Sequence, residues 1–259
     1  MPQDNISAEA ITRDLGTRLI GREVLYYPTL SSTMTVAGEQ ARKGAAEGTV
    51  VLAEEQTAGR GRMNRAWLAP GGNIALSLIL YPDLSSLPSL IMVASLAVVG
   101  GIAAATGLKP RIKWPNDVLI NGKKVCGILI ENSLQGEAVN YTIIGIGINV
   151  NLRPADFPEI QPMATSLADE LGREVSRLEV VRSLLVEMDR LYLSVVSGGS
   201  VYELWRDNMI TLGRQVRVTE GETLYQGVAE SVAPDGSLLL RGGDGKLTRI
   251  VVGDVTLRD

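Results

Sequence analysis

The segment "DVLINGKKVCGILIEN" (117–132) places two apolar runs on either side of Asn121-Gly122. Asn-Gly between such runs is a strong signal for a β-hairpin, because the favoured two-residue turn needs a positive φ at both central positions. The apolar segments "RIKWP" (111–115) and "YTIIGIGINV" (141–150) flank this hairpin and also predict strands. The middle of the chain is therefore predicted to form a sheet.

Further strands and helices are predicted on both sides of the hairpin. The upstream strands are "REVLYYP" (22–28), "TVVLAEEQ" (49–56) and "NIALSLIL" (73–80). Upstream helices are predicted over 7–19 with Ser7 as N-cap, over "LSSTMTVAGEQARKG" (30–44), and over about 88–106. Two capping boxes, Ser176 with Glu179 and Ser200 with Glu203, predict helices near 177–197 and 201–208.

The end of the chain has a different pattern. After about Thr211 it consists of short apolar runs separated by turns such as Asp235-Gly236 and Asp244-Gly245; the runs are "QVRVT", "TLYQGVAESV", "SLLLR" and "LTRIVV". This pattern predicts a compact β-module of the size of a small barrel. We place a domain boundary near residue 210, which gives domains 1–209 and 210–259.

The composition excludes several classes of enzyme. The 259-residue chain has no histidine and a single cysteine, Cys126, so it lacks the residues for a Ser-His-Asp triad, a Cys-His pair or a His-ligated metal site. Its formal net charge of −4 argues against wholesale nucleic-acid binding, although a local basic cluster could bind a polyanion. The chemistry must come from Lys, Arg, carboxylates, amides and backbone. A single unpaired thiol is typical of a reducing cytosol, so we expect a cytoplasmic protein.

One long apolar segment has two interpretations. No charged residue occurs from Leu84 to Leu108, and a segment of that length could span a bilayer. Its second half is mostly Gly and Ala, and it lacks the flanking basic cluster typical of membrane spans. We expect a buried helix in a mixed helix–sheet core, and no membrane partner. The N-terminus carries early acidic residues and no apolar run, so no signal peptide is expected.

The segment "QTAGRGRMNRAW" (56–67) concentrates three arginines and two glycines, namely Arg60, Arg62, Arg65, Gly59 and Gly61. It follows an apolar strand, and loops at strand ends bind ligands in open α/β sheets. Glycine lets backbone N–H groups approach an anion, and arginine matches phosphate or carboxylate oxygens with two hydrogen bonds. The segment therefore predicts an anion site whose loop is mobile when empty, and a solvated charged turn is the alternative. It fits neither the dinucleotide fingerprint nor the P-loop.

Three further segments carry groups suited to a ligand. In "IKWPNDV" (112–118) Lys113 lies between apolar neighbours and would be desolvated unless it meets an anion; a surface lysine beside a turn is the alternative. In "IIGIGINVN" (143–151) alternating glycines leave one strand face bare for a flat ligand, another backbone or a packed helix, and Asn149 ends the strand. The hydroxyls of "SSTM" (31–34) are either helix caps or ligand contacts.

Taken together and in this order, four segments resemble the biotin–protein ligase family, biotin–[acetyl-CoA-carboxylase] ligase, over roughly residues 30–151: "SST", "EEQTAGRGRMNRAWLAPGGNIALSL", "KWPNDVLINGKKVCGILIE" and "GIGINVN". The resemblance implies an α+β catalytic domain of the class II aminoacyl-tRNA synthetase-like, biotin–lipoate ligase type, with a mixed sheet and helices. It also implies a C-terminal SH3-like β-barrel. The implied reaction is biotinylation of a lysine on a biotin carboxyl carrier protein through biotinyl-5′-AMP. Biotin and ATP are the implied substrates, Mg²⁺ is the implied cofactor, and pyrophosphate and then AMP are released.

The resemblance also implies roles for individual residues. Biotin would be bound by Ser32, Thr33, Gln56, Gly59, Arg60, Gly61, Arg62, Lys113 and Gly145. ATP or the adenylate would be bound by Arg60, Arg62, Trp67, Lys113, Asn116 and Asn149, with Asn149 also holding Mg²⁺ indirectly. Lys113 and Arg62 would be catalytic, Lys113 by bridging the biotin carboxylate and the α-phosphate. The segment 152–164 matches a second family loop that orders over the adenylate.

The sequence departs from the family pattern at several points. Met34 stands where Asn is common, which removes any contact made by that amide, and Met63-Asn64 replaces a more basic pair found in some relatives. Only about 30 residues precede "SST", where relatives that double as repressors carry a DNA-binding domain, so we expect a monofunctional ligase that does not bind operator DNA. An exposed sheet edge would allow a homodimer, which the sequence alone does not show.

Two alternatives remain open. A lipoate–protein ligase or octanoyltransferase shares the catalytic fold, but would lack the "GRGR…W" and "KWPND" pair. A non-catalytic binding module would bind a protein or RNA through the β-module and leave the arginine loop without a function. Biotin-dependent exchange between ATP and pyrophosphate distinguishes both from a biotin ligase.

Overall fold

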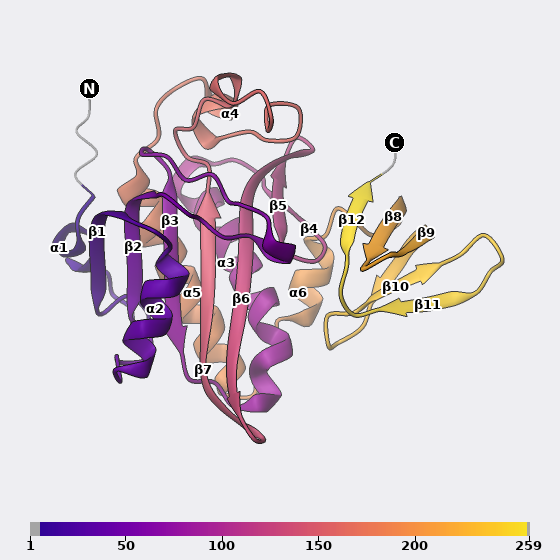
Figure 1. Cartoon of the computed structure of the whole chain (residues 1–259), viewed down its shortest axis with the longest axis horizontal. Coiled ribbons are helices and arrows are strands. Elements are labelled where there is room, and N and C mark those ends of the chain that lie inside the picture. The colour runs from indigo at the N-terminus through magenta and orange to yellow at the C-terminus, as the bar shows by residue number, and fades with distance from the viewer. Residues whose placement is uncertain (1–5, 258–259) are drawn as a thin grey trace.

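The computed structural model describes residues 6–257 and shows a mixed seven-stranded sheet with a smaller β-module at its side (Figure 1). The strand order is β1-β2-β3-β7-β6-β5-β4; β1 and β2 are parallel, and the other neighbouring strands are antiparallel. The strands are β1 (Val24–Leu30), β2 (Val50–Gln56), β3 (Ile74–Leu80), β4 (Arg111–Lys113), β5 (Asp117–Ile120), β6 (Lys123–Gln135) and β7 (Ala138–Ile148). The predicted combination of helices with a mixed sheet is confirmed.

The hairpin predicted at Asn121-Gly122 joins β5 to β6. Asn121 has a φ of 49° and Gly122 a φ of 81°, as the two-residue turn requires. β6 then continues as one strand of 13 residues and pairs with β7. Gly127 lies opposite Gly147 in this pairing, so glycines of two neighbouring strands meet side by side.

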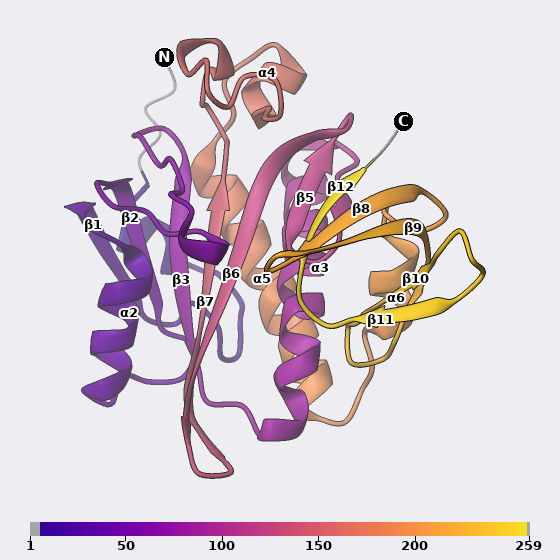
Figure 2. The same cartoon turned by 45° about the vertical axis from the view of Figure 1, so that its right-hand side comes forward.

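Helices cover both faces of the sheet (Figures 1 and 2). α3 (Leu87–Thr106) and α5 (Arg177–Val196) pack against each other on the rear face, and the shorter α2 (Thr33–Arg42) packs on the face that we call the front. Successive strand residues point to opposite faces, and here both sets are buried. The rear core includes Val50, Leu52, Leu76, Leu78, Ile144 and Ile146; the front core includes Val51, Ile79 and Ile143 with Met34, Ala37 and Ala41 of α2.

The long apolar segment forms α3, the core helix predicted for it. By length and composition it could cross a membrane, but it packs against the sheet, α5 and α6 (Tyr202–Asp207). α3 and α5 approach closely at Gly101, where an added Cβ would lie 2.7 Å from the Cα of Leu184. Burial of the helix among apolar neighbours accounts for its lack of charged residues.

The N-terminal helix is shorter than predicted. α1 covers Ala8–Thr12 rather than 7–19, with Ser7 as the expected N-cap. The chain then runs against α5, where the buried Asp189 carboxylate accepts hydrogen bonds at 3.0, 2.8 and 2.8 Å from the backbone N–H groups of Arg18, Leu19 and Ile20. In a helix extended to residue 19 these backbone N–H groups would donate to carbonyl groups of the helix itself. Their hydrogen bonds to the Asp189 carboxylate therefore account for the early end of α1.

The two predicted capping boxes have different outcomes. Ser176 caps α5, and its Oγ accepts from the Glu179 amide at 3.3 Å. The cap predicted at Ser200 is wrong, because α6 begins one residue later with Val201 as its N-cap, and the Ser200 hydroxyl accepts from the amide two residues on. Val201 is buried in the core, and its packing sets where this helix begins.

Two short elements are missing from the prediction. α4 (Leu167–Leu171) begins at the N-cap Ser166, whose Oγ accepts from the Asp169 amide. β12 (Asp254–Leu257) pairs antiparallel with β8 (Gln215–Glu220). Elements of four or five residues show too little of a helical or strand period to be recognised in a sequence.

The C-terminal module is a five-stranded antiparallel sheet in the order β11-β10-β9-β8-β12 (Figure 2). Its other strands are β9 (Thr223–Val232), β10 (Leu238–Arg241) and β11 (Leu247–Ile250). Trp114 docks the module on the body: its backbone N–H donates to Thr211 Oγ1 and its indole Nε1 to the Gly236 carbonyl, both at 2.8 Å. The predicted short strands are confirmed, and the tryptophan of "KWP" has a packing role at the junction.

We expect Asp189→Ala to lower the free energy of unfolding by about 2–4 kcal/mol, because three backbone N–H groups lose their acceptor. Urea unfolding followed by circular dichroism measures the change. Arg13→Ala, which breaks the exposed Glu9–Arg13 ion pair of α1, is the matched control and should change stability by less than about 0.5 kcal/mol. A loss at Asp189 no larger than at Arg13 would contradict the proposed anchoring of the N-terminal segment.

Candidate active site

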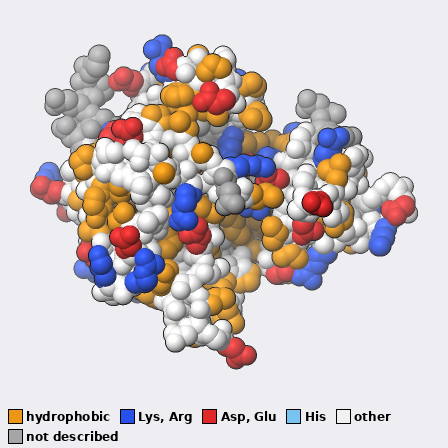
Figure 3. Space-filling model, in the orientation of Figure 1, with side chains coloured by type: hydrophobic (Ala, Val, Ile, Leu, Met, Phe, Trp, Pro, Cys, Tyr) orange, Lys and Arg blue, Asp and Glu red, His pale blue; other side chains and the backbone are white. Residues whose placement is uncertain are grey.

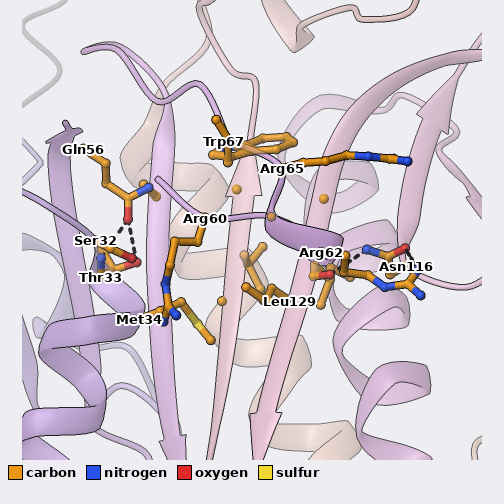
Figure 4. A pocket seen from close by; sticks show the side chains of 18 of the residues that line it. Ser32, Thr33, Met34, Gln56, Arg60, Arg62, Arg65, Trp67, Asn116 and Leu129 are labelled. Atoms are coloured by element: carbon orange, nitrogen blue, oxygen red, sulfur yellow. Dashed lines mark hydrogen bonds between the residues drawn. The ribbon is translucent and has the colours of Figure 1, made fainter. Parts of the chain in front are cut away.

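A cavity of about 120 Å³ lies on the front face of the sheet, next to the loop that follows β2 (Figure 4). Its lining comes from the start of α2, the segment 56–67, strands β3, β6 and β7, and the turn before β5. Asp254 of the C-terminal module also lines it. Figure 3 shows basic side chains on this face, near the junction between the body and the module. Segments far apart in the sequence therefore converge on one hollow.

Most of the residues predicted to contact a ligand line this cavity. They are Ser32, Thr33, Gln56, Arg60, Gly61, Arg62, Trp67, Asn116 and Gly145. The other predicted residues, Gly59, Lys113 and Asn149, do not line it. Most of the sequence motifs therefore converge on the cavity. Gly59, Lys113 and Asn149 lie outside its lining, and their own contacts are described below.

The floor of the cavity is glycine backbone. On the front face of β7, Gly145 and Gly147 follow Ile143, and neither carries a side chain that would fill this face. A Cβ added at Gly145 would lie 2.5 Å from the Met34 Sδ, and one at Gly147 would lie 2.3 Å from the Trp67 indole. The bare strand face predicted from the alternating glycines is therefore used for close approach, here by a thioether and an indole.

The end of the cavity next to α2 is lined by the uncharged polar side chains of Ser32, Thr33 and Gln56, and Arg60 lies beside Met34 (Figure 4). Gln56 Oε1 accepts from the backbone N–H of Thr33 at 2.7 Å and from its hydroxyl at 3.0 Å, and Ser77 donates to the Thr33 hydroxyl at 2.8 Å. Ser32 precedes α2 but makes no side-chain cap, and its buried Oγ has no hydrogen-bond partner. A buried unpaired hydroxyl is unfavourable, so its position favours a polar ligand atom over a helix cap.

The arginine loop folds back on itself as a narrow hairpin. The Trp67 amide donates to the Gly59 carbonyl at 2.9 Å, and the Gly61 amide donates to the Arg65 carbonyl at 2.7 Å. Gly59 is required here, since an added Cβ would lie 2.3 Å from the Trp67 carbonyl oxygen. The tip is a single 3₁₀ turn, η1 (Arg62–Asn64). This folding, rather than a ligand contact, accounts for Gly59.

Each arginine of the loop is paired, and Arg62 and Arg65 share Asp254. Arg60 pairs with Glu131 at 2.9 Å, and Arg65 pairs with Asp254. Arg62 donates to Asn116 Oδ1 at 2.8 Å and to the Gly253 carbonyl at 3.2 Å. Burial lowers the pKa of the Arg62 guanidinium below its usual value, and the charges of Asp254 and Asp117 oppose that shift. Arg62 and Arg65 therefore tie the loop to the C-terminal module.

Two lysines share Asp117, and only one of them lines the cavity. Lys113 Nζ lies 3.2 Å from Asp117 Oδ2, and Lys124 Nζ lies 2.5 Å from Oδ1. Burial raises the pKa of the Asp117 carboxyl, but the charges of Lys124 and Lys113 outweigh it and hold the pKa below its usual range. Lys124 lines the cavity and lies 5.4 Å from the centroid of the Trp67 ring, within the range of a cation–π contact.

Lys124 is a site residue that the sequence analysis missed. The Asn121-Gly122 turn could have indicated it, because the turn sets the register in which β5 pairs with β6. In that register Lys124 lies opposite Leu119 and close to Asp117. Asp254 was missed for a different reason, because β12 was not predicted. Met34 was noted only as a departure from a motif, whereas it lines the cavity and covers Gly145.

Asn149 lies beside the cavity rather than in its lining. It is buried, and its Nδ2 donates to the Thr165 carbonyl at 3.1 Å, which holds the segment after β7 in place. Within residues 6–257 no group of three or more Asp, Glu, Cys or His residues is arranged to hold a metal ion. The cavity carboxylates Asp117 and Asp254 are engaged by basic side chains. The described residues therefore do not build a Mg²⁺ site by themselves.

Family models match both parts of the chain. The model described as "Biotin/lipoate A/B protein ligase family" matches residues 26–149, which include the cavity-lining segments of the body. The model described as "Biotin protein ligase C terminal domain" matches residues 211–258. The two matches cover the cavity-lining segments of the body and the β-module separately.

Individual proteins and structures are similar over three quarters of the chain or more. The bifunctional ligase/repressor BirA of Bacillus subtilis is 40% identical over 258 residues, covering 97% of this chain and 79% of that protein. The biotin--[acetyl-CoA-carboxylase] ligase of Paracoccus denitrificans is 37% identical over 76% of this chain and 85% of its own. The biotin protein ligase of Aquifex aeolicus in complex with biotin and ATP superposes with a TM-score of 0.79 at 30% identity, covering 92% of this chain and 99% of the other. This chain belongs to the biotin protein ligase family.

Proposed function

We propose that this chain is an ATP-dependent ligase that joins biotin to a lysine of a biotin carboxyl carrier protein through biotinyl-5′-AMP. One observation carries the proposal: a single cavity has a neutral polar end at Ser32, Thr33 and Gln56, and a cationic end at Arg62 and Lys124. Biotin has the same polarity, with an uncharged ureido ring at one end and a carboxylate at the other. The glycine floor lies between the two ends.

The neutral end suits the ureido ring of biotin. The Ser32 hydroxyl is free to donate or accept, and Gln56 Oε1 is already occupied by Thr33, which leaves the Gln56 NH₂ group as a donor. The glycine backbone at Gly145 allows a flat ring to lie close to the strand. We therefore assign the ring to this end, with Arg60 and Gly61 of the loop at its side.

The first chemical step brings two anions together at the cationic end. A biotin carboxylate oxygen attacks the α-phosphorus of ATP, a phosphorus–oxygen bond forms, and the bond to pyrophosphate breaks. Arg62 and Lys124 stabilise the charge that accumulates, which in a partly dehydrated site is worth several kcal/mol. Asn116 orients Arg62 through its amide oxygen, and Trp67 shields the nucleotide side.

In the second step the lysine amine of the carrier attacks the acyl carbon of the adenylate. The amide bond forms as the bond between that carbon and the AMP oxygen breaks, AMP leaves, and the amine proton passes to solvent. No histidine is needed in either step, because the group attacked is already an activated anhydride: ATP in the first step and biotinyl-AMP in the second. Positioning and charge stabilisation carry the reaction.

We propose direct contact with the reacting groups for Lys124 and an indirect role for Lys113. The sequence motif assigns the bridging contact to Lys113, but Lys124 is the lysine in the cavity lining. Lys113 holds Asp117, and the second oxygen of that carboxylate holds Lys124. Lys113 is then a positioning residue that sets the location of the Lys124 ammonium group. The role of Asn149 is likewise to hold the segment that ends at α4.

The domain organisation follows from the same proposal. We assign residues 1–209 to a class II aminoacyl-tRNA synthetase-like catalytic domain and residues 210–259 to an SH3-like barrel, and we place the enzyme in the cytoplasm. The segment 152–164 would close over the adenylate. β1 and β4 end the seven-stranded sheet, and the backbone of β4 already bonds residues 208–210, so a homodimer would form through the β1 edge.

The proposed function predicts biotin-dependent exchange of labelled pyrophosphate into ATP. We expect exchange with biotin and none above background with lipoate or octanoate, since neither has a ureido group for Ser32 and Gln56. Exchange with lipoate alone would indicate a lipoate ligase. The absence of exchange with any of the three acids would indicate a binding module without ligase activity.

We expect substitutions of Lys124 and Lys113 to lower the rate of adenylate formation by different factors. Lys124→Met should lower the rate of adenylate formation by about 100- to 1,000-fold, as expected for loss of an electrostatic stabiliser. Lys113→Met should lower it less, by about tenfold, and Lys113→Arg should restore most of the rate because it still pairs with Asp117. Single-turnover formation of biotinyl-AMP measures all three. If Lys113→Met lowered the rate more than Lys124→Met, the bridging contact would have to be assigned to Lys113.

A further inference from the structure

A second hollow adjoins the cavity on the front face. It is a groove of about 300 Å³ between α2 and the hairpin of β6 and β7. Thr35, Gly38 and Arg42 line it from α2, and Glu131, Ser133 and Tyr141 line it from the hairpin. Met34 and Arg60 line both the groove and the cavity. These two side chains therefore stand between the two hollows.

The boundary can be located on β7. Ile143 lines the groove and not the cavity, whereas Gly145, the next residue on the same strand face, lines the cavity and not the groove. The Met34 thioether covers the strand at this point, with its Sδ 2.5 Å from the position of a Gly145 Cβ. Met34 is 4% exposed and packs with the front core at Ile143. Beside it, the Arg60–Glu131 ion pair spans the loop and β6 at 2.9 Å.

Met34 closes the neutral end of the cavity. Ser32 and Thr33 immediately precede it in the chain, and both belong to that uncharged end. Arg62 and Asn116 lie at the opposite side (Figure 4). Arg60 beside Met34 is already paired with Glu131. A ligand whose carboxylate meets Arg62 and Lys124 therefore presents its ring end to the Met34 side chain. The wall it meets there is a flexible, apolar thioether rather than backbone.

We infer that Met34 is the specificity-determining residue that limits the size of the acyl group at its ring end. The inference rests on the proposed function and adds a substrate class to it. With Met34 in place, the ligand ring ends at Gly145, and shortening this side chain joins the cavity to the groove. The enlarged site accepts carboxylic acids that carry an additional alkyl group on the ring.

The test compares biotin with analogues that carry a methyl or a propyl group on a ureido nitrogen. Adenylate formation is measured as kcat/KM for each acid in the wild type and in Met34→Ala, Met34→Val, Met34→Leu and Thr35→Ala. For each variant, kcat/KM for the propyl analogue is divided by kcat/KM for biotin. This ratio is compared between variants, because loss of one ureido N–H affects all variants alike. Met34→Leu keeps the side-chain volume, and Thr35 lines the groove alone.

We expect Met34→Ala and Met34→Val to raise this ratio by at least about tenfold over wild type, since one or more methylene groups gain room. Met34→Leu and Thr35→Ala should leave the ratio within about twofold of wild type. An unchanged ratio in Met34→Ala and Met34→Val, with biotin still adenylated by both, would overturn the inference. If Met34→Ala does not fold, the smaller change to Val decides alone.

Failure of the proposed function gives a different result. In that case the wild type shows no biotin-dependent exchange and biotin produces no shift in its melting temperature. Where biotin raises the melting temperature without exchange, the same series of analogues is compared by thermal shift in wild type and Met34→Val. A shift by the propyl analogue in Met34→Val but not in wild type supports the size limit independently of catalysis, and equal shifts contradict it.

Discussion

The site depends on a strip of sheet that has no side chains on its front face. Elsewhere the central strands are buried on both sides, and Ile143 still fills the space under α2. At Gly145, Gly147 and Gly127 the backbone is bare, and the Met34 thioether and the Trp67 indole come close enough that a Cβ would collide with them. Because side chains otherwise fill a sheet buried on both faces, this strip is what lets the thioether, the indole and, as we propose, a flat ligand ring lie close to the backbone.

Carboxylates and amides hold the cations around that strip. The net charge of the chain is −4, yet one end of the cavity is basic, and the basic groups there are paired with carboxylate or amide side chains. Asp117 holds both lysines, and Asp254 brings the C-terminal module to the arginine loop. These pairs keep like charges close together before a ligand arrives, and an anionic ligand then binds to groups that are already placed. The β-module thus lines the candidate active site as well as forming a neighbouring domain.

The sequence predicted the local features and not the long-range ones. The Asn121-Gly122 hairpin, the apolar strands and the Ser176 cap each rest on chemistry within a few residues, and all are confirmed. The early end of α1 is set by Asp189, about 170 residues away, and the Ser200 cap gave way to the packing of Val201. Lys124 enters the site because of strand register, and Asp254 because of how the module docks. Contacts of that kind depend on the assembled fold, which motifs alone do not specify.

The central claim is that one cavity separates a neutral ring end from a cationic acyl-phosphate end, and calorimetric titration tests it most directly. Biotin and a non-hydrolysable biotinyl-adenylate analogue are each titrated into wild type, Ser32→Ala and Arg62→Ala. Ser32→Ala should weaken both ligands by a similar factor of about 5 to 10, because both carry the ring. Arg62→Ala should weaken both ligands, because both present an anionic group to the cationic end, but the adenylate analogue should lose at least about tenfold and biotin clearly less. Equal losses for both ligands in Arg62→Ala, or a loss confined to the adenylate in Ser32→Ala, would contradict the assignment of the two ends.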